Sequence, residues 1–497
     1  MKKILVANRG EIAVRVLRAC RELGIPTVAV YSEPDAAALH VQLADSAVSI
    51  GPAPPTESYL DIDAIVAAAR KSGADAIHPG YGFLAENAAF AARCEAEGIT
   101  FIGPTADAIR IMGDKIASRD RMREAGVPLV PGTRGDDGDV DRLVADALEL
   151  PMPVMVKAAG GGGGKGMRIV RERNGLGDAV RAASREAASA FGNPSVYVEA
   201  YLENPRHIEF QIMADSHGNT LHFFERECSI QRRHQKLVEE TPSTVLTPEL
   251  RAQMGKTAVT VAEAIGYRNA GTVEFLFGPD GRFYFLEMNT RIQVEHPVTE
   301  LVTGVDLVTW QIRVARGEAL PFRQEDLHQR GHAIECRLYA EDAAHQFMPS
   351  SGRIRRLVEP TGPGVRVDSG IYEGWEVTTD YDPILSKVIT WGEDREAARL
   401  RMVQALDDTV CIGIHTATEY LRDVLNHEAF VAGETNTSFL AEHFADWTAG
   451  DDEVPDDVLI AAAILDSIAT SGGPRVDRAQ TAPSPWQTVG SWRLGGS

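Results

Sequence analysis

The N-terminal part of the chain alternates short apolar runs with amphipathic segments. The apolar runs predict strands at residues 3–7, 27–31, 74–77 and 100–102. After the first run, Ile12, Val16, Cys20 and Leu23 recur at helical spacing, so we expect a helix over residues 11–23 that ends at Gly24. Strands that alternate with helices predict a doubly wound parallel α/β domain.

The pattern changes after residues 133–141, an acidic, glycine-rich stretch that we interpret as an exposed loop. Strand-like runs follow at residues 207–214, 221–225, 271–277 and 282–287, short strands continue over 332–391, and helices are expected over 395–443. The chain is therefore predicted to combine α/β with α+β architecture, and its C-terminal region to be mainly antiparallel β with helices. Residues 448–457 have the composition of a linker, and residues 458–468 are predicted to be helical.

Composition narrows the class of protein. The 497 residues predict roughly three domains, and 50 Lys and Arg against 71 Asp and Glu give a net charge of −21, which argues against a nucleic-acid partner. The five cysteines are scattered, which argues against a disulfide framework or a zinc cluster. No signal peptide or membrane-spanning run is recognised, so we expect a cytoplasmic (bacterial-type) protein, or an organelle-matrix protein after processing.

The first strand-to-helix turn carries no dinucleotide fingerprint. Residues 7–11 read ANRGE and lack G-x-G-x-x-G, which argues against a nicotinamide cofactor. Ligands of such domains bind at the carboxyl ends of the strands, where this sequence places Arg9, Glu11, Tyr81 and Glu86. These four residues are candidates for the rim of a binding site. The sequence is equally compatible with their being ordinary loop residues.

A run of five glycines dominates the middle of the chain. Residues 157–166 read KAAGGGGGKG, which departs from a Walker A loop at Ala159 and at Gly166. Strand-like residues 154–157 and 167–170 flank the run as a hairpin would, so we interpret it as a lid over a nucleoside triphosphate, with a plain glycine-rich linker as the alternative. Lys157 would aim its ammonium at a phosphate.

A strand, a four-residue turn and a second strand span residues 271–289. With Phe277 paired to Arg282, Glu274 would lie opposite Phe285 and share a face with Glu287 and Asn289. Two carboxylates and an amide make an oxygen site that suits Mg²⁺ on nucleotide phosphates, although solvated carboxylates fit the pattern equally.

Two further runs carry charge near this predicted metal site. Arg291 and Glu295 could hold a small anion and remove its proton, or form a surface ion pair. Residues 225–236 read ERECSIQRRHQK, a basic, amide-rich run that suits a phosphate or ribose contact as well as a solvated edge.

Taken together, these runs resemble biotin carboxylase of the ATP-grasp superfamily, over about residues 1–445. The resemblance rests on ANRGEIA (7–13), HPGYGFLAEN (78–87), GDK (113–115), KAAGGGGGKGM (157–167), ENPRHIEFQ (203–211), ERECSIQRRHQK (225–236) and EMNTRIQVEHPVTE (287–300). The last two motifs are specific to this family within the superfamily. The resemblance favours the functional interpretation of each run above.

The resemblance implies a role for individual residues. The ATP phosphates would be held by Lys115, Lys157, Gly161, Gly162, Gly163, Gly164, Lys165 and Gly166, and the adenine and ribose by Glu199, Leu202, His207, Gln231 and His234. Two Mg²⁺ or Mn²⁺ ions would bind Glu274, Glu287 and Asn289. Bicarbonate would bind Lys236, Arg291, Gln293 and the Val294 backbone, with Glu295 as its base, and biotin would meet Tyr81 and Arg337.

It also implies the domain plan and the reaction. We expect a biotin carboxylase N-terminal α/β domain at residues 1–113, an ATP-grasp domain at 114–330 whose mobile lid spans about 131–203, and a C-terminal domain at 331–445. ATP and bicarbonate would form carboxyphosphate, which supplies CO₂ to biotin carried on a carrier protein or domain. The expected partners are that biotin carboxyl carrier and the carboxyltransferase β subunit of an acyl-CoA carboxylase, with a homodimer possible.

Residues 446–497 resemble the start of the biotin-transfer region of α subunits. No Ala-Met-Lys-Met-like biotinylation sequence occurs in the chain, so we expect the carrier to be a separate protein or the chain to be shortened before it. The alternatives to an active enzyme are a subunit that serves as a non-catalytic scaffold, and another bicarbonate-activating ATP-grasp ligase. The resemblance does not indicate which acyl-CoA is the final acceptor.

Overall fold

The structure is a computed structural model that describes residues 1–134, 139–159, 167–450 and 456–470. It divides into two compact units, residues 1–448 and 449–497. The second unit contains the helix α16 (Asp456–Thr470), which agrees with the helix predicted there. The other helices and strands named here belong to the first unit. The remaining part of the predicted biotin-transfer-like region, residues 451–455 and 471–497, lies outside the described residues.

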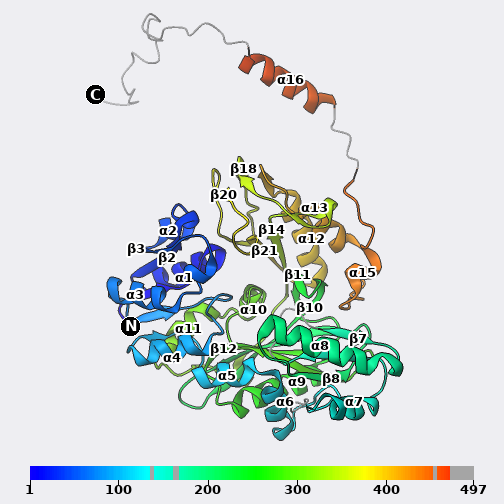
Figure 1. Ribbon diagram of the computed structural model, residues 1–497. Helices are drawn as coiled ribbons and strands as arrows, with labels where there is room; N and C mark the ends of the chain where they lie inside the picture. Colours follow the sequence, from blue (N-terminus) through cyan, green and yellow to red (C-terminus); the bar gives the residue numbers. More distant parts are fainter. Residues whose placement is uncertain (135–138, 160–166, 451–455, 471–497) are drawn as a thin grey trace, which may run out of the picture. The chain divides into compact units, whose positions relative to one another are not determined.

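The N-terminal region is the predicted parallel α/β layer (Figure 1). Its strands are β1 (Ile4–Val6), β2 (Thr27–Ser32), β3 (Ser46–Gly51), β4 (Ala76–His78) and β5 (Thr100–Phe101), in the order β3-β2-β1-β4-β5. Its helices are α1 (Gly10–Glu22), α2 (Leu39–Leu43), α3 (Ile62–Ser72), α4 (Ala88–Ala96) and α5 (Ala106–Gly113). The sequence pattern missed β3, because this edge strand buries little more than Ile50 and shows no apolar run.

An eight-stranded, antiparallel sheet forms the centre of the molecule, in the order β13-β12-β9-β10-β11-β14-β21-β19. The strands are β9 (Arg206–Ala214), β10 (Thr220–Arg232), β11 (Gln235–Thr241), β12 (Asn269–Phe277), β13 (Phe283–Asn289), β14 (His332–Tyr339), β19 (Val365–Ser369) and β21 (Ile384–Gly392). β11 pairs with β14, so one sheet runs across the boundary that we expected near residue 330. The central and C-terminal regions therefore share their backbone hydrogen bonding.

The two faces of this sheet differ in polarity, as the period of two along a strand requires. On β9 and β12, Ile208, Phe210, Val273 and Phe275 point to one side and pack against α9 (Pro248–Ala264). The alternate residues of the same strands are polar and point to the other side. The apolar face builds the core, and the polar face is left for chemistry.

The register of β12 and β13 corrects one prediction. Phe277 pairs with Phe283 rather than with Arg282, and Phe285 lies opposite Phe275 in the apolar core rather than opposite Glu274. A β-bulge at Leu286 then shifts the alternation by one residue, so that Glu287 lies directly opposite Glu274. Without the bulge, Glu287 would share the core face with Phe283 and Phe285.

The segment between the N-terminal region and the sheet forms a small layer of its own. Its strands are β6 (Val154–Ala158), β7 (Arg168–Val170) and β8 (Val196–Ala200), in the order β7-β6-β8, with helices α6 (Lys115–Glu124), α7 (Val140–Leu148) and α8 (Leu176–Phe191). β6 and β7 pair in antiparallel fashion, with Val154 opposite Val170, which confirms the predicted flanking strands. The glycine run at residues 160–166 lies outside the described residues.

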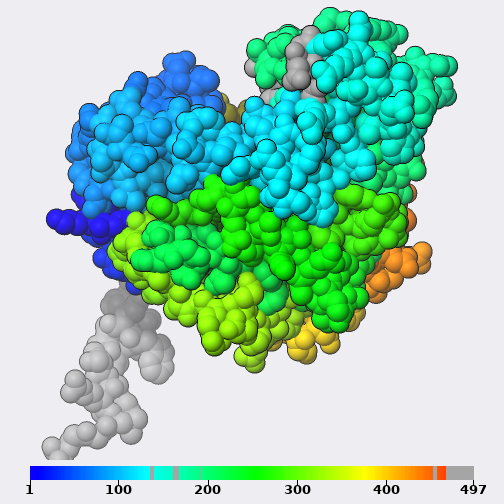
Figure 2. Space-filling model, turned by 90° about the horizontal axis from the view of Figure 1, so that it is seen from below, coloured from blue at the N-terminus to red at the C-terminus, as the bar shows by residue number. Residues whose placement is uncertain are grey.

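Further helices and short strands complete the first unit. These helices are α10 (His296–Thr303), α11 (Leu307–Ala315), α12 (Arg395–Asp407), α13 (Thr418–Asn426), α14 (Glu428–Val431) and α15 (Phe439–His443). The short strands are β15 (Glu341–Asp342), β16 (Met348–Pro349), β17 (Gly352–Arg353), β18 (Arg356–Val358), β20 (Glu376–Val377) and β22 (Val410–Ile412). Figure 2 shows the blue N-terminal region and the cyan-to-green segment that follows it on either side of a notch. No helix among the described residues is long and apolar enough to cross a membrane.

The aromatic core under the polar face leads to a prediction about the stability of the protein. Phe275 is fully buried, with its ring centroid 5.5 Å from that of Phe283 and 6.1 Å from that of Phe210. We expect Phe275→Ala to lower the free energy of unfolding by about 3–5 kcal/mol, because it leaves a cavity between these rings. Urea unfolding followed by circular dichroism measures this, and Ile412→Ala, at an exposed apolar position, is the control that should change little. A loss of less than about 1 kcal/mol for Phe275→Ala would contradict the packing described.

Candidate active site

A cleft of about 1050 Å³ opens over the polar face of the central sheet. It is lined by sixteen of the predicted site residues: Lys115, Lys157, Glu199, Leu202, His207, Gln231, His234, Lys236, Glu274, Glu287, Asn289, Arg291, Gln293, Val294, Glu295 and Arg337. The predicted lid residues Gly161, Gly162, Gly163, Gly164, Lys165 and Gly166 lie outside the described residues. Tyr81 is not among the lining residues, and its hydroxyl donates a hydrogen bond to Glu11. The structure thus brings together residues that are up to 222 positions apart, from Lys115 to Arg337.

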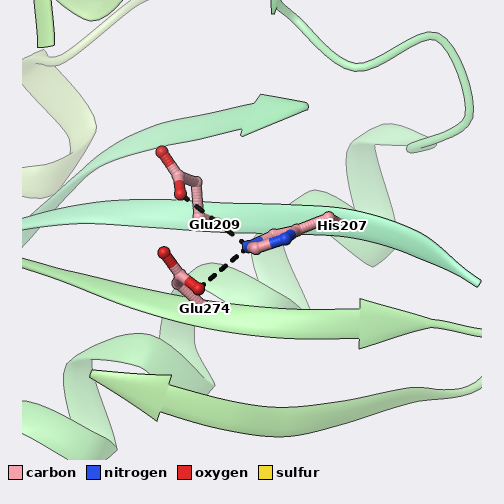
Figure 3. A group of neighbouring side chains, drawn as sticks. All are labelled: His207, Glu209 and Glu274. Carbon is pink, nitrogen blue, oxygen red and sulfur yellow. Dashed lines mark ion pairs between the residues drawn. The ribbon is translucent and has the colours of Figure 1, made fainter. Parts of the chain in front are cut away.

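The floor of the cleft is a row of charged side chains on neighbouring strands. Arg226 of β10 lies opposite Glu209 of β9, which lies opposite Glu274 of β12, which lies opposite Glu287 of β13. Figure 3 shows His207 on the same strand as Glu209, with its ring turned toward the two carboxylates; its Nε2 is 3.0 Å from Glu274 Oε2 and 4.0 Å from Glu209 Oε2. Three carboxylates side by side concentrate negative charge in this floor.

Lys236 neutralises much of that charge. Its Nζ donates to a carboxylate oxygen of Glu209, to Glu274 Oε1 at 3.0 Å and to Glu295 Oε1 at 2.7 Å. Burial would lower the pKa of Lys236, but the anionic groups around it raise that pKa well above its usual value. The ammonium therefore stays charged and ties the sheet to the loop that carries Glu295.

Arg226 anchors the other side of the floor. Its guanidinium is completely buried, and its five N–H groups each have a partner: Glu209 Oε1 at 2.6 Å, Gln211 Oε1 at 2.8 Å, Thr299 Oγ1 at 3.1 Å, Thr272 Oγ1 at 3.1 Å and Gln293 Oε1 at 2.7 Å. A buried guanidinium is tolerated only with such complete pairing. The bond to Gln293 orients that amide so that its Nε2 donates to Glu274 Oε1 at 2.8 Å.

Glu295 stands at the start of α10 between two cations. Oε1 accepts from Lys236, and Oε2 accepts from Arg337 Nη2 at 2.9 Å. Burial would raise the pKa of Glu295, but Lys236, Arg337 and Arg226 hold it well below its usual range. Arg337 in turn donates from Nε to Glu239 Oε1 at 2.6 Å, so a second carboxylate holds its guanidinium in place.

Glu274 and Glu287 form the part of the floor that suits a divalent cation. Glu274 accepts from Asn289 Nδ2 at 2.8 Å as well as from Lys236 and Gln293. Among the described residues no hydrogen-bond donor contacts the Glu287 carboxylate, and burial together with the facing Glu274 raises its pKa. Two opposed carboxylates with this excess of negative charge form a hard oxygen site of the kind that Mg²⁺ and Mn²⁺ prefer.

The end of the cleft that carries Arg291 is held by a residue from the N-terminal region. Glu86, one of the candidate rim residues, accepts from Arg291 Nε at 2.8 Å and from the Thr290 backbone N–H at 2.9 Å. Arg291 Nη2 also donates to Asn289 Oδ1 at 2.8 Å. These contacts hold the loop after β13 against the cleft and leave Arg291 partly exposed within it. Of the other rim candidates, Arg9 pairs with Asp35 at 2.6 Å, outside the cleft.

Lys115 and Lys157, the two lysines predicted to hold phosphates, also line the cleft. Lys157 forms an ion pair with Glu199 of β8, and Glu199 also pairs with Arg119 Nη1 at 2.8 Å. Burial lowers the pKa of Lys115 from its usual value, while Glu287 across the cleft opposes that change. Both ammonium groups therefore border the space above the carboxylate floor.

Sequence reasoning assigned no role to Glu209, Arg226, Glu239 or Lys387. Glu209 lies two positions from His207 on one strand, so the period of two already placed it on the same face. Arg226 has no comparable signal, because its partners come from four separate segments. Cys228 is fully buried with its Sγ 4.0 Å from Glu295 Oε1, and burial raises the pKa of its thiol well above its usual value.

Family models match nearly the whole of this unit. "Biotin carboxylase, N-terminal domain" matches residues 1–109, "Carbamoyl-phosphate synthase L chain, ATP binding domain" matches residues 114–323, and "Biotin carboxylase C-terminal domain" matches residues 335–442. The order of the three matches follows the order of the regions described above.

Similar proteins and structures agree with these models. The chain is 55% identical to biotin carboxylase 1 of Bacillus subtilis over 88% of this chain and 98% of that protein, and 53% identical to the biotin carboxylase of Pseudomonas aeruginosa over 88% and 98%. It is 48% identical to the α subunit of mitochondrial methylcrotonoyl-CoA carboxylase of Dictyostelium discoideum, over 99% of this chain and 70% of that protein.

Among solved structures, the chain is similar to the biotin carboxylase domain dimer of the Hydrogenobacter thermophilus 2-oxoglutarate carboxylase. That structure was solved with MgADP, ADP and bicarbonate; the TM-score is 0.86 at 49% identity, over 90% of this chain and 99% of the other. The structure of a biotin carboxylase–β-γ-ATP complex from Campylobacter jejuni also gives a TM-score of 0.86, at 46% identity, over 89% of this chain and 99% of the other. The carboxylate floor and the two cations beside Glu295 agree with these matches. The chain belongs to the biotin carboxylase family of ATP-dependent ligases.

Proposed function

We propose that the chain catalyses the biotin carboxylase half-reaction, in which ATP, bicarbonate and a carrier-bound biotin give ADP, phosphate and carboxybiotin. The observation that carries this proposal is the position of Glu295. It lies between Lys236 and Arg337 in the same cleft as the opposed carboxylates Glu274 and Glu287. This reaction needs a base, an anion site and a site for a divalent cation, and adjoining groups of this cleft would supply all three.

Bicarbonate binding would use groups that are already turned toward the cleft. Lys236, Arg291, Gln293 and the Val294 backbone would hold its oxygens, and Glu295 would remove its proton. The contacts with Lys236 and Arg337 make Glu295 a weak base. An anion that draws Lys236 toward itself would weaken one of these contacts and raise the pKa of Glu295 at the moment when a base is needed.

The nucleotide would lie between the lid side and the carboxylate floor. Glu199, Leu202, His207, Gln231 and His234 would line the adenine and ribose, and Lys115, Lys157 and the lid at Gly161–Gly166 would hold the phosphates. Mg²⁺ or Mn²⁺ at Glu274, Glu287 and Asn289 would neutralise phosphate charge as the γ-phosphoryl group is transferred. Deprotonated bicarbonate attacks the γ-phosphorus and ADP leaves, which gives carboxyphosphate.

The second half of the reaction would take place around Arg337. Carboxyphosphate separates into CO₂ and phosphate, and the phosphate takes the proton from the ureido nitrogen of biotin. Arg337 stabilises the resulting enolate, whose nitrogen attacks CO₂. Because Glu239 also holds Arg337, the guanidinium keeps one anchor when Glu295 turns to bicarbonate. Tyr81 would contact biotin, and closure of the lid would keep water from carboxyphosphate.

The chain would act within a larger complex. The similarity to the α chain of a methylcrotonoyl-CoA carboxylase extends over 99% of this chain, including residues beyond 448, which supports a biotin-dependent acyl-CoA carboxylase. The partners would be a biotin carboxyl carrier and a carboxyltransferase β subunit, and a second copy of the chain, as in the Hydrogenobacter dimer. The similarity to bacterial biotin carboxylases is consistent with a cytoplasmic location.

The first test is ADP release from MgATP, measured with and without bicarbonate and free biotin. We expect a bicarbonate-dependent rate that biotin stimulates and that Glu295→Gln lowers by about 10²–10⁴-fold, because the amide cannot take the proton. Glu263→Gln, at an exposed position on α9, is the matched control and should keep the full rate.

Two results would contradict this proposal. ADP release that is indifferent to bicarbonate and biotin would indicate another ATP-grasp ligase. MgATP binding without turnover, even when a biotinylated carrier protein is supplied, would indicate a scaffold subunit.

The second test concerns the carboxylate pair. We expect Glu287→Gln to raise the Mg²⁺ concentration for half-maximal ADP release by at least about tenfold, equivalent to about 1.4 kcal/mol. Burial and the facing Glu274 raise the pKa of Glu287, so its charged form destabilises the metal-free protein at neutral pH. Without metal, the neutral Gln variant should therefore melt at the same temperature as the wild type or at a higher one. Thermal melts with and without Mg²⁺ measure this. An unchanged Mg²⁺ dependence together with a lower metal-free melting temperature would show a structural role instead.

A further inference from the structure

Lys387, which belongs to none of the family motifs, lies behind the active site. Lys387 is on β21, next to Arg337 of β14 and Asp368 of β19, and its side chain is completely buried. Its ammonium donates a hydrogen bond to the Val294 carbonyl oxygen. That carbonyl belongs to the peptide that joins Val294 to Glu295, so Lys387 holds the main chain of the proposed base.

The ionic partner of Lys387 is Glu11 rather than Asp368. Nζ lies 3.4 Å from Glu11 Oε2 and 4.0 Å from Asp368 Oδ2. The Asp368 carboxylate is already held by Arg366, at 2.9 Å from Nε and 2.8 Å from Nη2. Glu11 has no cation other than Lys387 within ion-pair distance among the described residues.

Glu11 extends the connection to the biotin side of the site. It belongs to α1, it is almost completely buried, and its Oε1 accepts the hydroxyl of Tyr81. The start of α1 is pressed against the end of β19, because a Cβ atom on Gly370 would lie 2.5 Å from the Glu11 backbone nitrogen. This close approach requires glycine and fixes where the Glu11 carboxylate can reach.

The contacts therefore form one continuous path through buried atoms. It begins at the Glu295 main chain, passes through the Val294 carbonyl, Lys387 and Glu11, and ends at the Tyr81 hydroxyl. Four segments far apart in the sequence contribute, namely α1, the loop after β4, the loop before α10, and β21. Burying such an ion pair costs several kcal/mol of desolvation per ion, so it is a costly way to obtain packing alone.

We propose that Lys387 and Glu11 are a pair of positioning residues that hold the base Glu295 and the biotin-side Tyr81 in one fixed arrangement. This rests on the proposed function. The pair touches neither substrate: Lys387 acts through the Val294–Glu295 peptide and Glu11 acts through Tyr81. Loss of the pair would then weaken the binding of both bicarbonate and biotin. It would leave the binding of the nucleotide, which would lie between the lid side and the carboxylate floor, unchanged.

Steady-state kinetics of Lys387→Met test this proposal, because Met keeps most of the side-chain length and removes the ammonium. We expect turnover to fall by about 10- to 100-fold, with higher KM values for both bicarbonate and free biotin, and the KM for MgATP to stay within about twofold. Glu11→Gln keeps an oxygen for the Tyr81 hydroxyl but loses the charge, and should raise the same two KM values less. The double variant should be no worse than Lys387→Met alone, since both substitutions break one interaction.

Arg15→Met is the matched control. Arg15 is another buried cation on α1, it pairs with Glu300 of α10 at 3.0 Å, and it contacts neither Val294 nor Tyr81. We expect it to lower the melting temperature without a joint rise of the bicarbonate and biotin KM values. The same pattern in Lys387→Met and Glu11→Gln, a lower melting temperature with unchanged KM values, would overturn the positioning role. A wild-type protein without bicarbonate-dependent turnover would instead overturn the proposed function itself, and this inference with it.

Discussion

Three carboxylates from three segments of the chain converge on the ammonium group of Lys236. Carboxylates packed this closely cannot all remain ionised in a buried site unless cations lie among them, since two unit charges 4 Å apart interact by about 4 kcal/mol even at an effective dielectric constant of 20. Lys236 and Arg226 supply those cations from neighbouring strands of one sheet. The charged side chains of the cleft floor therefore form one network, in which each side chain is held in position by its neighbours.

This network of charged side chains explains why the site needs the whole unit around it. The sheet supplies the carboxylates and Lys236, the N-terminal region supplies Glu86 behind Arg291, and β14 supplies Arg337 behind Glu295. None of these regions has a complete set of paired charges by itself. A reaction that gathers two anionic substrates and a divalent cation benefits from such preorganisation, because the polar groups need little rearrangement when the substrates arrive.

Much of the fold could be read from local patterns, and much of the site from motifs. Apolar runs that alternate with helices predicted the parallel layer, and the period of two along residues 271–289 predicted that Glu274, Glu287 and Asn289 share one face. The motifs, together with the family resemblance that added Glu199, Leu202 and Arg337, supplied sixteen residues that the structure gathers around one cleft. What they could not supply is the support behind those residues. Arg226, Glu239 and Lys387 act through contacts across the sheet or between regions, and the register of such contacts is not written in any local pattern. The edge strand β3 was missed for the opposite reason, since it buries too little to leave a pattern.

The bulge at Leu286 shows how a correct prediction can rest on the wrong geometry. Glu274 and Glu287 do share a face, yet simple alternation from Phe283 and Phe285 would have sent Glu287 into the apolar core. Leu286 is the one extra residue between two successive pairs, so its deletion would leave regular pairing with Glu287 still opposite Glu274. A strand that keeps Leu286 but pairs without the bulge would instead turn Glu287 toward the core and Met288 toward the cleft. In comparisons with distant relatives, a relative that lacks this residue can therefore still carry the matching carboxylate, provided that the one-residue gap is placed at Leu286 and not after Glu287.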